Sequence, residues 1–339
     1  MKSLKSILKY SFTLVIAFGL LWYVFRDIDL REMLRKVKTA NFTFVYISIA
    51  LSLVSHYLRG YRWTLLLKPL NYKVHSVRAF LAVMVGYFAN LLLPRMGEIT
   101  RCAILKKTDN VAIPASFGTV ISERIIDLLL LVLLVISTII IEFKILRNFL
   151  TDYMNAFLSN LNVFNYLIMG GIFLALVIAS VWVYQRNKEY IKTTTLYSKV
   201  KPLMHELING LNSIRKVKEK TAFFVSTLMI WVLYYLMSYI IVFSFPETSG
   251  LNFFAGLSIL MAGGLGMAAP VQGGIGTYHA FVAGILLLYG ISKEDGLLFA
   301  TLLHTSQFIS ILFFGGVSFI ISLFLSKNPN GNKPENIGS

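Results

Sequence analysis

Cysteine and charge are scarce in this chain, and each shortage excludes a class of protein. The single cysteine, Cys102, excludes an internal disulfide and a CxxC metal site. Charged residues make up 14% of the 339 residues, against roughly 25% in soluble globular domains, while 56% are hydrophobic. This composition excludes a soluble globular protein.

Motifs of common enzymes are missing as well. The chain has no G-x-x-x-x-G-K-[ST] phosphate loop, no G-x-S-x-G, no HExxH and no paired CxxC. No stretch between the apolar runs is long enough to form a soluble enzyme domain. We therefore expect no catalytic activity, no internal ATP engine and no cofactor or metal.

Long apolar runs are abundant. A hydrocarbon core about 30 Å thick needs about 20 apolar residues per helical crossing. Runs close to this length are residues 7–25, 42–58, 77–93, 116–141, 166–184, 222–245, 251–269, 275–291 and 297–325. They predict an all-α polytopic membrane protein with about 6–8 transmembrane helices. We expect one transmembrane domain, residues 1–326, and a disordered polar tail, residues 327–339.

Positive charge exceeds negative charge. The 32 Lys and Arg outnumber the 16 Asp and Glu, giving a net charge of +16. Cytoplasmic loops of membrane proteins collect such residues, and no nucleic-acid-binding module fits between the runs, so we expect no nucleic-acid partner. The most basic segment, residues 185–220, predicts a cytoplasmic loop, with both termini on that side of the cell inner membrane. Its apolar stripe over residues 203–217 suits a helix on the membrane surface or a plain connector.

A re-entrant hairpin is predicted where two basic segments flank one apolar run. Residues 59–73 and 95–107 both look cytoplasmic, yet a full crossing by residues 77–93 would separate them. A helix that turns near Pro94 and Gly97 and returns to its own side removes this conflict. Such irregular backbone is tolerated where protein or a watery cavity surrounds it.

A second break follows in the other half. Pro270, Gly273, Gly274 and Gly276 interrupt residues 251–291, and both breaks share the spacing P-x-x-G-x-I. Paired interrupted helices are typical of a transporter's midplane site. With the second hairpin entering from outside, the halves would form an inverted repeat. The alternative is a tight loop between two full spans.

Charged residues lie beside the first break. Glu123 and Asp127 are four residues apart on one helical face, with Arg124 next to Glu123. Two like charges need a cation between them, and Arg95 and Arg101 are candidates. A buried charge costs about 2.5–3.5 kcal/mol on insertion scales, so we predict a paired network. In that network, Glu98 is placed to meet Arg124 or Arg59.

This network has two interpretations. It either holds the bundle together or binds an anionic headgroup, since the guanidinium fork suits phosphate and a helix starting after Gly97 offers free N–H groups. Arg59 and Arg62, near aromatic residues, are interpreted first as interfacial anchors and second as headgroup contacts. Asn90 is expected to brace the first hairpin. Gln272 and His279 in the second break are secondary candidates, and a His279–His304 metal pair is the weaker interpretation.

Four motifs in order resemble a known family. They are R-G-Y-R-W-x-x-L-L (59–67), N-L-L-L-P-R-M-G-E-x-x-R (90–101), E-R-x-x-D (123–127) and P-x-x-G-G-I-G (270–276). The sequence resembles the lysylphosphatidylglycerol synthase transmembrane-region family, the flippase-like domain of the multiple peptide resistance factor, here without the aminoacyltransferase domain. The resemblance implies an inner-membrane protein that moves or binds phosphate-bearing lipids through Arg95, Glu98, Arg101, Glu123, Arg124 and Asp127. It departs from the family at His279, where many members have glutamate.

The leading hypothesis is a flippase or scramblase-like transporter for an anionic or polyprenyl-phosphate-linked lipid. The alternative is an accessory subunit that presents lipid to a separate lipid-modifying transferase. An enzyme using Glu98 and Asp127 as an acid pair is the third possibility.

Overall fold

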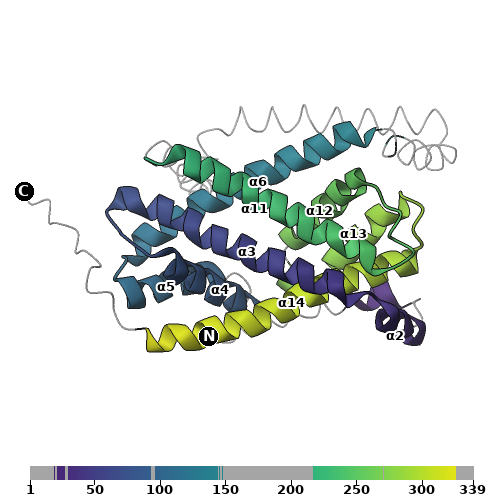
Figure 1. The fold of residues 1–339 in the computed structure, drawn as a ribbon, viewed down its shortest axis with the longest axis horizontal. Coiled ribbons are helices and arrows are strands. Elements are labelled where there is room, and N and C mark those ends of the chain that lie inside the picture. Colours follow the sequence, from purple (N-terminus) through teal and green to yellow (C-terminus); the bar gives the residue numbers. More distant parts are fainter. Residues whose placement is uncertain are drawn as a thin grey trace, which may run out of the picture.

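The protein is helical throughout the part described by the structure, a computed structural model that covers residues 19, 21–26, 30–92, 96–143, 145, 147, 217–269 and 271–325 (Figure 1). The helices are α2 (Leu30–Thr39), α3 (Phe42–Leu67), α4 (Ser76–Leu92), α5 (Gly97–Asp109), α6 (Ile113–Ile141), α11 (Lys220–Tyr239), α12 (Phe253–Ala268), α13 (Thr277–Leu287) and α14 (Lys293–Phe324). Three short 3-10 turns are η1 (Lys68–Leu70), η2 (Ile240–Ser244) and η3 (Gln272–Gly274).

Four of these helices are long and apolar enough to cross a membrane. They lie in Phe42–Leu70, Ile113–Ile141, Lys220–Ser244 and Lys293–Phe324. The prediction of an all-α polytopic membrane protein is confirmed. The predicted run 166–184, the loop 185–216 and the tail 327–339 lie outside the described residues, as does most of run 7–25.

The first predicted hairpin is formed by α4 and α5. Its tip brings Gly97 beside Gly86, and its base brings Arg78 beside Thr108, whose carbonyl accepts a 3.0 Å hydrogen bond from Arg78 Nη1. With 17 and 13 residues, the helices rise about 25 and 20 Å, less than a ~30 Å bilayer core. The chain therefore returns to the end of the bundle from which it came.

The second hairpin is formed by α12 and α13. Thr277 Oγ1 donates to the Gly266 carbonyl at 2.8 Å near the tip, and the Ser258 and Tyr289 hydroxyls are 2.8 Å apart nearer the base. The helices have 16 and 11 residues, or about 24 and 16 Å, too short for two separate spans. The structure therefore favours the hairpin over the tight loop between full spans.

The two hairpins enter from opposite ends of the bundle (Figure 1). Lys107, at the base of the first, donates to the Leu323 carbonyl at the end of α14 over 3.1 Å. The second hairpin ends just before α14 begins, where Lys36 pairs with Asp295 at 2.6 Å. The tips meet, since Gln272 Nε2 donates to the Leu91 carbonyl at 3.1 Å.

Both halves therefore repeat one order of elements: long helix, short hairpin, long helix. The first half is α3, α4–α5 and α6, and the second is α11, α12–α13 and α14. The leading helices α3 and α11 are antiparallel, because Ser48 bonds to the Met237 carbonyl at one end and Lys68 pairs with Glu219 at the other. This arrangement agrees with the predicted inverted repeat.

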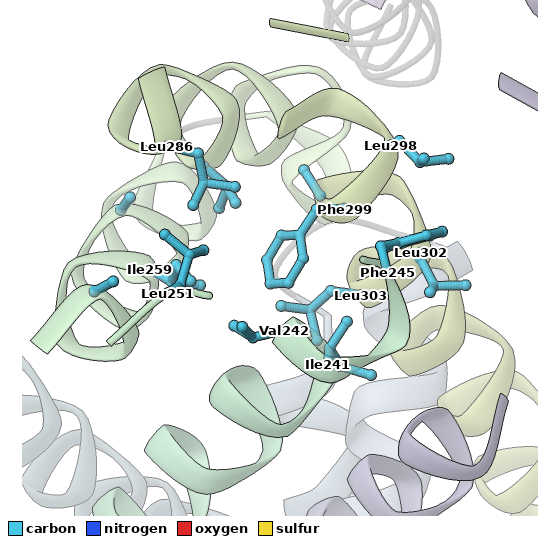
Figure 2. Packing of buried hydrophobic residues seen from close by; sticks show 14 of the residues in the cluster. Ile241, Val242, Phe245, Leu251, Ile259, Leu286, Leu298, Phe299, Leu302 and Leu303 are labelled. Carbon is cyan, nitrogen blue, oxygen red and sulfur yellow. The ribbon is translucent and has the colours of Figure 1, made fainter. Parts of the chain in front are cut away.

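Apolar packing fixes each hairpin in place. Trp63, Ala82, Leu105 and other residues pack α3, α4 and α5 together, and none of these three is more than 1% exposed. A second cluster joins η2, α12, α13 and α14. Figure 2 shows the ring of Phe299 lying among Leu286, Leu303 and Ile241. Both hairpins are thus held against long helices that can cross the bilayer.

Candidate functional site

A network of charged side chains joins α3, α5 and α6. Its centre is Asp127, whose two carboxylate oxygens each receive one guanidinium. Arg59 Nη2 lies 3.1 Å from Oδ2, and Arg62 Nη2 lies 2.9 Å from Oδ1. Glu123 and Asp127 are four residues apart on α6, and Arg59 and Arg62 are three residues apart on α3. Each pair therefore lies on one helical face, and the two helices meet through these charged side chains.

Glu123 forms the deepest part of the network. Its Oε2 lies 2.8 Å from Arg101 Nη2, and its Oε1 lies 3.7 Å from Arg62 Nε. Both Glu123 and Arg62 are 0% exposed. The Arg101 guanidinium also lies over the Trp63 ring, 4.7 Å from its centroid, which adds a cation–π contact. Arg101 thereby links the first hairpin to α6, as predicted.

The outer edge of the network is the pair Glu98–Arg124, with 3.3 Å between Oε1 and Nη2. The Arg124 side chain is 42% exposed and lies one helical turn before Leu128, which is 56% exposed. The network therefore reaches from an exposed surface of α6 into the interior.

Helix α11 supplies neutral partners that the sequence analysis missed. Arg59 Nη1 donates to the Tyr234 hydroxyl at 2.8 Å, and Arg62 Nη1 lies 3.5 Å from Thr227 Oγ1. Tyr87 of α4 also faces Arg59, with 5.8 Å between the guanidinium carbon and the ring centroid. A buried tyrosine hydroxyl usually has a hydrogen-bond partner. The presence of Tyr234 in the apolar run 222–245 is therefore the sequence signal that could have revealed this contact.

The buried part of the network carries excess positive charge among the described residues. Three guanidiniums (Arg59, Arg62, Arg101) face two carboxylates (Glu123, Asp127), so three minus two leaves one positive charge. The Nε atoms of all three arginines, Arg101 Nη2 and both carboxylate oxygens of Glu123 are buried without a hydrogen-bond partner in the described chain. Uncompensated buried charge and unpaired donors are costly, so this arrangement is chemically suited to an anion.

The interpretation of Arg59 and Arg62 as interfacial anchors is wrong. They are only 3% and 0% exposed. The predicted run ended at residue 58, whereas the span continues over Phe42–Leu70. Arg59 consequently lies about 14 Å along the helix from Lys68, within this span rather than at its end. Arg95, the other predicted partner of the carboxylates, lies outside the described residues.

The hairpin tips use their glycines differently. Asn90 Oδ1 accepts a 2.7 Å hydrogen bond from the Gly97 N–H, so Asn90 braces the first tip as predicted. Gly97 is required by close approach, because a Cβ there would overlap the Gly86 carbonyl. Gly273, Gly274 and Gly276 instead have φ of +59°, +69° and +84°, a region that favours glycine. Pro94 and Pro270 lie outside the described residues.

The secondary candidates cluster at the second tip. His304 Nε2 donates to the Gly273 carbonyl at 2.8 Å, and its ring centroid lies 5.0 Å from that of His279 at an interplanar angle of 72°. With Gln272 bonded to Leu91, these side chains fix the tip against α14 and α4. Within the described ranges, no group of three or more His, Cys, Asp or Glu could hold a metal ion.

Comparison with known proteins agrees with this architecture. A UPF0104 membrane protein of Methanocaldococcus jannaschii is 25% identical over 263 residues, covering 69% of this chain and 74% of the relative. Another, from Pyrococcus horikoshii, is 23% identical over 301 residues, covering 81% and 84%. The glycosyltransferase AglD of Haloferax volcanii is 29% identical over 103 residues, which cover 30% of this chain and 16% of that protein. No solved structure matches the chain.

The family model described as the lysylphosphatidylglycerol synthase TM region matches residues 10–315, which include both hairpins and the charged network. This multi-pass membrane protein therefore belongs to the lysylphosphatidylglycerol synthase transmembrane-region family.

Proposed function

We propose that this protein is a flippase or scramblase-like transporter for a lipid with a phosphate-bearing headgroup. The observation that carries the proposal is the buried network with one excess positive charge, which extends to an exposed surface of α6. The headgroup would pass along the charged residues while its acyl or polyprenyl tails stay in the bilayer. No catalytic step by this chain is part of the proposal.

The exposure of the network supports an entry from the lipid side. A phosphate approaching α6 would meet Arg124 first, at 42% exposure, and then Asp127, whose side chain is 16% exposed. The phosphate would then replace the carboxylates as the acceptor of hydrogen bonds from the guanidinium N–H groups of Arg59 and Arg62. Such exchange keeps each arginine paired throughout, which avoids the penalty of a bare buried charge.

The hairpins supply a physical basis for alternating access. They enter from opposite ends and are joined at their tips by the hydrogen bond between Gln272 and Leu91. Transporters with paired broken helices move one repeat against the other around a midplane site. We propose that rocking at this junction opens the network toward one end and then the other.

We further propose an orientation in the cytoplasmic membrane. The end of the bundle at the first hairpin's base carries mainly basic residues, namely Lys68, Lys73, Arg78, Lys106, Lys107, Lys218 and Lys220. The other end carries five basic residues, Arg31, Arg35, Lys36, Lys38 and Lys293, beside the acidic residues Glu32, Glu247, Glu294 and Asp295. Seven basic residues against five give a small excess at the Lys68 end, and the positive-inside rule counts Lys and Arg, so we place the Lys68 end in the cytoplasm.

The test is headgroup translocation in proteoliposomes that contain fluorescent phosphatidylglycerol, with an impermeant quencher outside. We expect wild-type protein to accelerate loss of the protected fluorescence over empty vesicles, and Arg62→Gln and Asp127→Asn to slow it at least about tenfold, since about 1.4 kcal/mol corresponds to a factor of ten. Arg35→Gln, which changes an arginine with a 77% exposed side chain, is the matched control and should behave as wild type. Folding is matched by size-exclusion profile and thermal unfolding.

The second candidate function is an accessory subunit that presents lipid to a separate transferase. The similarity over 103 residues to a Haloferax volcanii glycosyltransferase favours it, since a related membrane segment there belongs to a chain named for sugar transfer. Folded wild-type protein that binds phosphatidylglycerol and a polyprenyl phosphate but moves neither would reject the transporter in favour of this candidate.

A further inference from the structure

His56 is a buried histidine near the middle of the span Phe42–Leu70, and the charged network does not use it. It is 6% exposed, and its Nε2 lies 3.2 Å from the Ser52 hydroxyl. Its Nδ1 is buried with no hydrogen-bond partner in the described part of the chain. An unpaired ring nitrogen in an apolar interior costs free energy unless a hydrogen-bond partner reaches it in some state of the protein.

The surroundings of His56 connect it to the network. Its ring centroid lies 4.8 Å from that of Tyr87 on α4, and the Arg59 guanidinium lies over the same Tyr87 ring. Arg59 is also one helical turn from His56 on α3. Arg59 in turn contacts Asp127 of α6 and Tyr234 of α11, so these two titratable groups are linked to His56 through Arg59.

Charge decides when His56 can hold a proton. Without a bound anion, an imidazolium would be a second positive charge next to a network that already has one in excess, and the interior would screen their repulsion poorly. A phosphodiester bound at Arg59 would cancel that excess. The buried charge would then be the same after binding one anion and one proton together as before binding, and an N–H at Nδ1 could donate to the anion.

We propose that His56 is a proton-binding site coupled to anion binding at the charged network, so that a phosphate-bearing headgroup and one proton bind together. This inference rests on the proposed function, because it requires the network to bind an anion. Thermodynamic linkage makes the coupling reciprocal: the anion favours the proton, and the proton favours the anion. Anion affinity should accordingly fall as pH rises.

The experiment measures binding of dihexanoylphosphatidylglycerol to the full-length protein in detergent by titration calorimetry. This probe keeps one negative charge over the working pH range, so any pH dependence belongs to the protein. Titrations in two buffers of different ionisation enthalpy give the number of protons taken up on binding. We expect wild type to take up a proton and to lose affinity by up to about tenfold per pH unit while only the complex is protonated.

His56→Gln should bind the probe with no proton uptake and no pH dependence. His75→Gln, which changes an exposed histidine at the start of α4, is the matched control and should keep both. If wild type binds without proton uptake, or His56→Gln keeps the uptake, the inference is wrong while the proposed function stands. If folded wild type binds neither this probe nor a short-chain polyprenyl phosphate at any pH, the proposed function fails and the inference fails with it. If His56→Gln does not fold, the buffer comparison on wild type still overturns the inference when no proton is taken up.

Discussion

Among single residues, the buried arginines carry the largest energetic consequences. Arg62 is fully buried, and its neighbours Glu123 and Asp127 supply its charge partners. Replacing such an ion pair by apolar groups can be neutral, whereas removing one partner leaves a bare charge that costs several kcal/mol. The network therefore responds to each substitution according to the charge it leaves behind.

This reasoning gives a prediction for Glu123. Glu123→Gln raises the buried excess from one positive charge to two, so we expect it to lower the free energy of unfolding by about 3–5 kcal/mol. Adding Arg101→Gln removes the partner of that carboxylate and should restore a substantial part of the loss. The measurement is unfolding in detergent of wild type, both single variants and the double variant. Glu32→Gln, in an exposed pair, serves as control, and strictly additive losses would contradict the prediction.

The residues of this site were only partly predictable from the sequence. Spacing placed Glu123 and Asp127 on one face, because helical periodicity is a local property. The need of two like charges for a cation then gave Arg95 and Arg101 as candidate partners. Arg59 and Arg62 were predicted to lie at the membrane–water interface, because the apolar run ends at the residue before Arg59. The helix continues because Asp127, more than sixty residues later in the sequence, receives both guanidiniums, and no local pattern reveals such a partner.

At the scale of elements, the first hairpin depends on close contact between its two helices. Gly86 and Gly97 face each other so closely that neither has room for a Cβ, and Asn90 closes the tip. Glycine normally weakens a helix, so its use here exchanges intrinsic helix stability for packing.

We accordingly predict that Gly97→Ala destabilises the protein by about 1–3 kcal/mol, the usual cost of overpacking. Gly118→Ala in α6 is the matched control, because a Cβ there meets nothing within 4 Å. It should be neutral or stabilising by up to about 1 kcal/mol, as alanine favours the helix. Thermal unfolding of both variants in detergent tests this, and an unchanged midpoint for Gly97→Ala would show that the hairpin has room for a Cβ at this position.

Element boundaries were predictable where glycine and proline interrupt apolar runs. The first hairpin was expected because basic segments flank one apolar run, and the second break was interpreted either as a hairpin or as a tight loop between two spans. Both sets of helices prove shorter than a bilayer. The shared P-x-x-G-x-I spacing did not reveal that Gly97 serves close packing while Gly273 serves a positive φ. A glycine in the sequence shows that a side chain is disfavoured at that position. Whether the reason is a close contact or a positive φ is known only from the three-dimensional structure.

For the whole molecule, the decisive feature is that both hairpins return to their own ends. The contacts Arg78–Thr108 and Lys107–Leu323 place both ends of the first hairpin together, and Lys36–Asp295 marks the opposite end. The opposite directions of the halves were inferred from basic segments and are matched by these contacts.

Cysteine labelling tests this arrangement. In a Cys102→Ala background, Lys73→Cys and Lys106→Cys, both exposed at the first hairpin's base, should react with an impermeant maleimide only from the cytoplasmic side. Ser249→Cys and Glu294→Cys should react only from the other side. Labelling of positions 73 and 106 from different sides of the membrane would contradict the hairpin.

The contact between Lys107 and Leu323 also has a consequence for biogenesis. These residues are 216 positions apart, so the base of the first hairpin can be completed only after the last helix has left the ribosome. Until α6 emerges, Arg101 likewise lacks Glu123. The α4–α5 hairpin therefore cannot form all of its contacts until α14 has been translated. Truncation near the C-terminus should leave α4 and α5 accessible to membrane quality-control proteases.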